Sequence, residues 1–166
     1  MPNNVFKAID AALVFAVDDA SSPEGAAADS LISNYDLANV VGRLTDVTVN
    51  VTSAIRPFFE LGQRYPTQLR PGVVHVTGTA GRAHVNGALL RLLLGDGAAS
   101  PPGAANFVQP ALNIVTTLKD PSFPDNQTRV TVFGAKFASW TYHIPSDDFV
   151  MESVAFQALR VSFEEK

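Results

Sequence analysis

The chain contains no cysteine and few charges, and these absences remove several classes of protein. Without cysteine among its 166 residues it has no disulfides and no thiolate metal ligands, which suits a reducing cytoplasm. Charged residues make up 17% of the chain and the net charge is −4, which argues against a nucleic-acid binder that works by neutralising phosphates. No stretch reaches the roughly 18 apolar residues of a membrane span, so we expect no membrane insertion.

Length and composition favour one globular domain. A chain of this length with 46% hydrophobic residues can bury a core and fits a single domain over residues 1–166. Stretches rich in Gly, Pro, Ala and Ser interrupt the hydrophobic patterns, and we expect flexible loops there, near residues 20–30, 55–72 and 96–106.

Alternation of apolar and polar residues predicts a mainly β protein. Val47, Val49 and Val51 alternate with Thr and Asn, which is the period of a half-buried strand. One helix is expected over residues 87–94, because its leucines form a wide apolar surface and Gly95 follows. Similar alternation predicts four further strands, at residues 73–82, 112–118, 129–144 and 149–163.

The last of these strands changes its apolar face partway along. Val154 and Phe156 are apolar at even positions, whereas Val161 and Phe163 are apolar at odd positions. Either a β-bulge or a strand that leaves one sheet and joins another would produce this switch near residues 157–158.

No group of residues indicates a reaction centre. His75, His84 and His143 lack the spacing of metal ligands, and Asp147 and Asp148 are adjacent, so on a strand they would point apart rather than converge on one substrate. We therefore expect no catalytic residues, no metal site, no cofactor and no enzymatic activity.

The C-terminal region is typical of a hairpin with structural roles for its polar and aromatic residues. Pro145 favours a turn, and Asp147 and Asp148 can accept hydrogen bonds from local amides. Such a turn would set the register of 137–144 against 149–156. Trp140 is the largest side chain available to pack this pair.

The order of several segments resembles the tail tube protein of a contractile-tailed bacteriophage. The segments are RPFFELGQRYP at 56–66, PGVVHVTGTAGRAHVNG at 71–87, FGAKFASW at 133–140 and IPSDDFVME at 144–152, with the leucine helix after the second. The resemblance covers roughly residues 37–163 and lies in the order of these strand and turn patterns.

This resemblance implies a fold and a role. The fold would be an antiparallel β-sandwich or small barrel with one flanking α-helix. Six copies would form a ring, and rings would stack into a hollow tube that conducts DNA into the host without binding it specifically. Partners would be further copies and the tail sheath, baseplate and tail terminator proteins. The protein would be a virion component assembled in the bacterial host cytoplasm. Tail-tip and tube-initiating proteins share the fold, so the protein could form either the body of the tube or a ring at its end.

Two surfaces are expected to carry assembly. The first is an apolar loop at 55–71, with contacts to a neighbouring ring or subunit expected from Arg56, Phe58, Phe59, Glu60, Arg64 and Tyr65. The second is a polar face that would line the channel. Its expected members are Thr48, Asn50, Thr52, His75, Thr77 and Thr79.

A different class of function stays open at this stage. A β-sandwich that binds a small ligand or carbohydrate should expose a cluster of aromatics and make few subunit contacts. Trp140 and Tyr142 share one strand face, with parity opposite to that of Phe137. A clean monomer in solution would favour this alternative.

Overall fold

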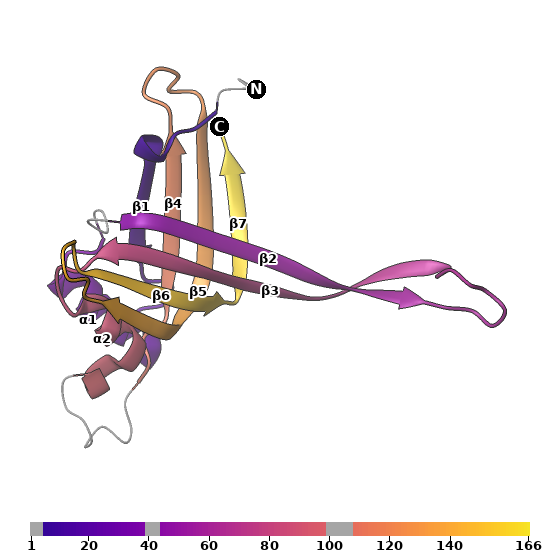
Figure 1. Ribbon diagram of the computed structural model, residues 1–166, viewed down its shortest axis with the longest axis horizontal. Coiled ribbons are helices and arrows are strands. Elements are labelled where there is room, and N and C mark those ends of the chain that lie inside the picture. Colours follow the sequence, from indigo (N-terminus) through magenta and orange to yellow (C-terminus); the bar gives the residue numbers. More distant parts are fainter. Residues whose placement is uncertain (1–4, 39–43, 99–107) are drawn as a thin grey trace.

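The computed structural model describes residues 5–38, 44–98 and 108–166. It is mainly β, as predicted, and all its strand pairs are antiparallel. Figure 1 shows the elements. In chain order they are η1 (Ala8–Asp10), β1 (Ala11–Ala16), α1 (Pro23–Asn34), β2 (Leu44–Phe58), β3 (Gln68–Ala83), α2 (Ala88–Leu94), η2 (Gly95–Ala98), β4 (Leu112–Lys119), β5 (Gln127–His143), β6 (Met151–Ala158) and β7 (Arg160–Glu165).

The sheet consists of two halves that share β5. In the body half-sheet, β1, β4, residues 127–135 of β5 and β7 pair side by side. In the arm half-sheet, residues 136–143 of β5 pair with β6, followed by β3 and β2. The two halves cross in Figure 1. The edge strands β1 and β2 do not pair with each other, so the sheet in the described chain is not closed into a barrel.

The predicted switch of face in the last strand is confirmed, and its cause is a change of sheet. β6 ends at Ala158 and pairs in the arm half-sheet, whereas β7 begins at Arg160 and pairs with β5 in the body half-sheet. Between them the amide of Leu159 donates to the carbonyl of Phe133 at 3.0 Å. The one-residue interruption therefore transfers the strand between half-sheets.

The core lies between the half-sheets and under two helices. Phe15, Phe137 and Phe156 are its largest fully buried side chains, and Phe15 and Phe137 meet edge to face with ring centroids 6.0 Å apart. The predicted leucine helix is α2. Leu89 and Leu92 are buried in this core, and Gly95 follows with φ +58°.

A second helix occupies the region predicted as a loop at 20–30, so that prediction is wrong. α1 begins at Pro23, and the Ser22 side chain accepts a hydrogen bond from the amide of Gly25 at 3.0 Å. Serine at the N-cap and proline at the first helical position form a standard helix start. Ala28 and Ile32 then join the core.

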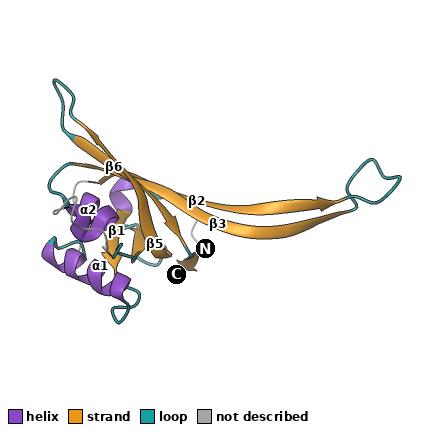
Figure 2. Cartoon of the chain, turned by 90° about the horizontal axis from the view of Figure 1, so that it is seen from below, coloured by secondary structure: helices purple, strands orange, loops and turns teal. Residues whose placement is uncertain are grey.

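The loop predicted at 55–72 is shorter than expected. β2 continues to Phe58 and β3 starts at Gln68, so the turn spans only residues 59–67. From Gln68 to His75, β3 pairs with β2 alone, and this two-stranded part projects from the body as a long arm (Figures 1 and 2). Pro57 and Pro71 fit there because each strand of the arm has one free edge. Of the loop predicted at 96–106, residues 99–106 lie outside the described residues.

Candidate assembly surfaces

The six residues predicted to line a channel lie together on one face of the β2–β3 hairpin. The register places Thr48 opposite Thr79, Asn50 opposite Thr77 and Thr52 opposite His75. Directly opposed residues of an antiparallel pair share a face, so the alternation in the sequence identified the shared face correctly. Five of the six are exposed and Thr77 is partly buried.

This polar face continues across the arm half-sheet. Thr77 is opposite Gln157 of β6, while Ser153 of β6 is opposite Thr141 of β5. The charged side chains near it are balanced or peripheral: Lys136 Nζ lies 2.7 Å from Glu24 Oε1, and Asp46 stands at the start of β2. The centre of the face is polar and uncharged.

The residues predicted to contact a neighbouring ring or subunit lie at the outer end of the arm, called here the arm tip (residues 55–71). Arg56 and Phe58 belong to β2, and the other four belong to the turn. All are exposed. Leu61 is fully exposed, at 104%, and Tyr65 is 78% exposed. Further exposed apolar residues lie on the arm and at its base, namely Leu69, Val73 and Val74 on β3 and Val51 on β2.

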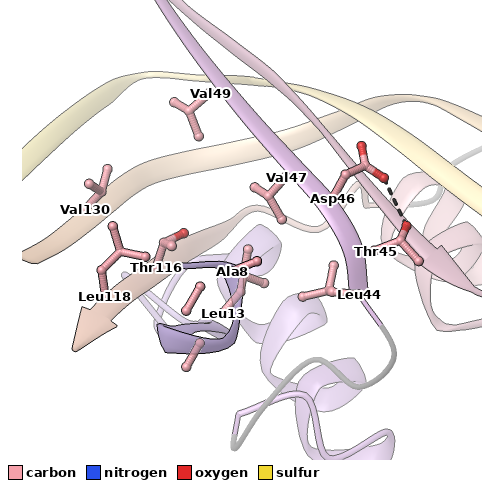
Figure 3. A pocket seen from close by; sticks show the side chains of 12 residues that line it. Ala8, Leu13, Leu44, Thr45, Asp46, Val47, Val49, Thr116, Leu118 and Val130 are labelled. Atoms are coloured by element: carbon pink, nitrogen blue, oxygen red, sulfur yellow. Dashed lines mark hydrogen bonds between the residues drawn. The ribbon is translucent and has the colours of Figure 1, made fainter. Parts of the chain in front are cut away.

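An apolar groove opens between the inner face of the body half-sheet and β2 (Figure 3). Its volume is about 430 Å³, and its lining includes Leu13, Leu118 and Val130 on one side and Val47 and Val49 on the other. Nothing in the sequence pointed to it, because its walls come from four strands that are distant along the chain.

A buried ion pair anchors the end of the arm half-sheet that lies away from the arm. Arg82 Nε lies 2.6 Å from Glu152 Oε1, and the side chains are 3% and 0% exposed. Trp140 Nε1 donates to Glu152 Oε2 at 2.9 Å. His84 Nδ1 stands 3.2 Å from the same oxygen, but no hydrogen-bond partner satisfies it. A carboxylate buried this deeply needs several donors. Sequence patterns did not indicate that Arg82 and Trp140 would meet at Glu152.

Trp140 occupies a position that simple alternation mispredicted. A register irregularity between Phe137 and Ser139 shifts the strand by one residue. Phe137 is therefore opposite Phe156 and Trp140 opposite Val154, which puts both aromatics on the core-facing side. The Trp140 ring is partly buried against the core and stacks on Tyr142, with centroids 5.3 Å apart.

The turn acids lie outside this cluster. Asp147 and Asp148 are exposed in the connection between β5 and β6, and Asp148 Oδ1 accepts from the amide of Phe149 at 2.7 Å. The two segments of this hairpin pair as expected at Phe137, which is opposite Phe156, but the irregularity shifts the pairing by one residue toward the turn, where His143 is opposite Met151. A structural role for both aspartates stays a prediction.

The described residues contain no cluster of three or more His, Asp or Glu side chains able to hold a metal ion. Within the same residues, no helix is long and apolar enough to cross a membrane. The three histidines are separate: His75 lies on the polar face, His84 beside Glu152, and His143 at the end of β5.

Comparison with known proteins finds similarity in structure alone, since no family model and no curated protein matches. A chain of the PVC sheath-tube complex, from an extracellular contractile injection system, aligns with a TM-score of 0.64 at 12% identity, over 99% of this chain and 94% of that one. The tube-terminating cap of the anti-feeding prophage gives 0.62 at 11%, over 100% and 95%. The SPP1 tail tube gives 0.54 at 15%, over 98% and 80%. The chain therefore has the tail-tube fold, which the resemblance in its sequence predicted.

Proposed function

We propose that this protein is the structural subunit of a tail tube, in which rings of six copies stack around a channel that conducts DNA into the host. The observation that carries the proposal is the arm. A two-stranded hairpin is marginal by itself in water, yet this one projects clear of the body (Figure 2). It also carries several exposed apolar side chains. Such a surface needs a partner to cover it.

The open edges of the arm half-sheet support ring formation. β2 forms one edge, and residues 136–143 of β5, which pair only with β6 among the described strands, form the other. Long unpaired edges invite pairing with further strands. Pairing β2 of one copy with β5 of the next is head-to-tail, and a head-to-tail contact closes into a ring if its rotation allows.

The polar face would then line the channel. It is rich in Thr, Ser, Asn and Gln and carries little charge at its centre. Such a face would not bind DNA phosphates strongly, so DNA could pass along it. The contacts expected are with other copies, sheath, baseplate and tail terminator proteins. The protein would be located in the phage tail, after assembly in the host cytoplasm. No catalysis or cofactor enters this role.

A position at the end of the tube, in place of the tube body, is the alternative that the comparisons support. The cap of the anti-feeding prophage aligns nearly as well as the sheath-tube complex, so this chain would serve equally as an end ring or tube initiator. An end ring would form hexamers that stop at one or two layers.

Electron microscopy of the purified protein tests the proposal directly. Long tubes would support the tube body, and single or double rings would support the end position. Native mass spectrometry should show multiples of six. A clean monomer at all concentrations would refute both positions and would favour a ligand-binding β-sandwich.

A further inference from the structure

We propose that, of the free edge of β5, only residues 139–143 receive a strand of the next copy, and that Gln109 is the residue that ends this receiving edge. The inference rests on the proposed function and deepens it, because it names the part of β5 that a neighbouring copy can use. It also names the side chain that fixes where the incoming strand stops.

Gln109 occupies the edge of β5 at the point where β4 stops covering it. The pairing of β5 with β4 ends at Ala135. The chain before β4 cannot extend that pairing, because Pro110 has no N–H to donate and the amide of Ala111 donates to a carbonyl of α1 at 3.3 Å. The Gln109 side chain takes its place, and its Nε2 donates to the carbonyl of Phe137 at 2.7 Å. That carbonyl is therefore not free to accept from another copy.

Two further features close the same short stretch of the edge. A register irregularity between Phe137 and Ser139 makes Ala138 an extra residue, and a bulge of this kind disrupts the regular ladder. Next to it, Lys136 Nζ lies 2.7 Å from Glu24 Oε1, and a lysine on an edge strand opposes pairing with a further strand. Residues 136–138 are thus closed to a neighbour.

The rest of this edge is open. From Ser139 to His143, β5 pairs with β6 on one side and with no described strand on the other. Exposure changes at the same place, since Phe137 is buried whereas Ser139 and Thr141 are exposed. The strands β5, β6, β3 and β2 alternate in direction, so β2 and β5 run in opposite directions. Rotation about a ring axis preserves these directions, and the β2 strand of the next copy would lie antiparallel to this edge.

A stop is needed because the pattern of side chains does not exclude a slip by two residues. Side chains alternate with a period of two, so registers two residues apart keep every side chain on its face. The stagger of the strands and the size of a barrel are linked, and such a slip would change the number of copies in a ring or its diameter. The hydrogen bond at Phe137 ends the edge at one place, which makes Gln109 a positioning residue for ring closure.

Substitution of Gln109 tests this role. Gln109→Met keeps a similar length and removes the donor, and Gln109→Glu keeps the size and polarity but also lacks the donor. The matched control is Gln127→Met, because Gln127 is also partly buried but lies opposite Lys119, in the part of β5 that β4 covers. Native mass spectrometry and electron microscopy report ring size, and Tm reports folding.

Cysteine cross-linking reports the register between copies, because the parent has no cysteine. Ser139→Cys is combined in turn with Asp46→Cys, Thr48→Cys, Asn50→Cys or Thr52→Cys. Within one copy, β6 and β3 separate Ser139 from β2, so a disulfide between these positions forms only between copies. Each combination is made in the parent, in both Gln109 variants and in the control, and the products are separated on a denaturing gel without reductant.

We expect the parent and the control to show one predominant partner for residue 139 and rings of one size. Both Gln109 variants should keep Tm within a few degrees, form rings of mixed size and give at least a fivefold increase in a second partner two residues from the first. If the parent forms rings of six but both variants keep its register and ring size, or do not fold, the inference fails and the proposed function stands. Rings of six without any cross-link from residue 139 would also overturn it. If the parent stays monomeric and no combination cross-links, both fail.

Discussion

At the scale of single residues, Glu152 organises the polar contacts that hold the end of the arm half-sheet. Its carboxylate is fully buried and takes donors from Arg82 and Trp140. Trp140→Phe would keep an aromatic ring but remove the Nε1 donor together with part of the indole ring, so we expect a loss of at least about 1–3 kcal/mol in the free energy of unfolding, the usual cost of leaving a buried acceptor short of a partner. Trp140→Ala also removes packing and should cost about 3 kcal/mol or more. Urea unfolding of both variants separates the two contributions, and a Trp140→Phe variant as stable as the parent would show that the donor is dispensable.

Asp19 gives a second prediction at this scale, with a pH dependence of known sign. Hydrogen bonds from the Ser21 side chain and amide hold the pKa of the Asp19 carboxyl below its ordinary value of 3.8. A carboxyl with a lowered folded-state pKa stabilises the protein above its unfolded pKa, and this contribution is lost as pH falls through the folded pKa. Asp19→Asn should therefore lower Tm at pH 6 and make little difference near pH 2. A difference in Tm that is independent of pH would mean that the charge has no part in the effect.

At the scale of elements, β5 is the strand on which the two half-sheets depend, and Gly134 lies where it passes between them. Its φ is +62°, a conformation that costs other residues about 1–2 kcal/mol. We expect Gly134→Ala to lose about that much stability and Gly134→Asn to lose less, because Asn tolerates the left-handed region better. The Cβ would also meet the Leu159 side chain, but that side chain is exposed and free to move. Equal losses for Ala and Asn would assign the effect to crowding instead of backbone conformation.

The arm is the element whose loss should separate folding from assembly. Replacing Phe58 and Phe59 with Ser removes apolar area from the arm tip and leaves the core untouched. We expect Tm to stay within a few degrees of the parent while tubes disappear from micrographs. The control replaces Phe123 and Phe149, which are 51% and 79% exposed away from the arm, with Ser. Tubes should persist in the control, and tubes of normal length in the arm variant would exclude the tip from assembly.

Sequence patterns predicted the elements that obey simple periods and missed those set by context. The alternation at Val47–Val51 predicted both the strand and its polar face. The parity break near residue 158 indicated either a bulge or a change of sheet, and the structure shows a change of sheet. α1 was missed because its alanine-rich sequence reads like a loop until Ser22 and Pro23 are recognised as cap and first turn. Prolines concealed the arm, since they are excluded from central strands but tolerated on free edges. The groove and the Glu152 cluster depend on contacts between distant strands, which no local pattern encodes.

At the scale of the whole molecule, the near-neutral polar face decides whether a channel would release or retain DNA. Asn50 and Thr77 are directly opposite each other on that face, so replacing both with Lys would add two charges per copy, repeated around a ring. Each layer would then attract phosphates strongly and release counterions on binding. We expect tubes of this variant to retain short DNA at low salt and lose it as salt rises, and particles that carry it to eject their genome slowly.

The matched control places the same two charges elsewhere, with Ser33→Lys on α1 and Ser122→Lys in the turn between β4 and β5, both exposed. It changes net charge equally, so any effect of overall charge on assembly or on DNA binding should appear in both variants. Retention confined to the Asn50 and Thr77 variant would place the polar face on the channel, because only there can six copies surround one DNA molecule. Equal retention in both variants, or none in either with tubes intact, would place the polar face away from the channel and require a different surface to line it.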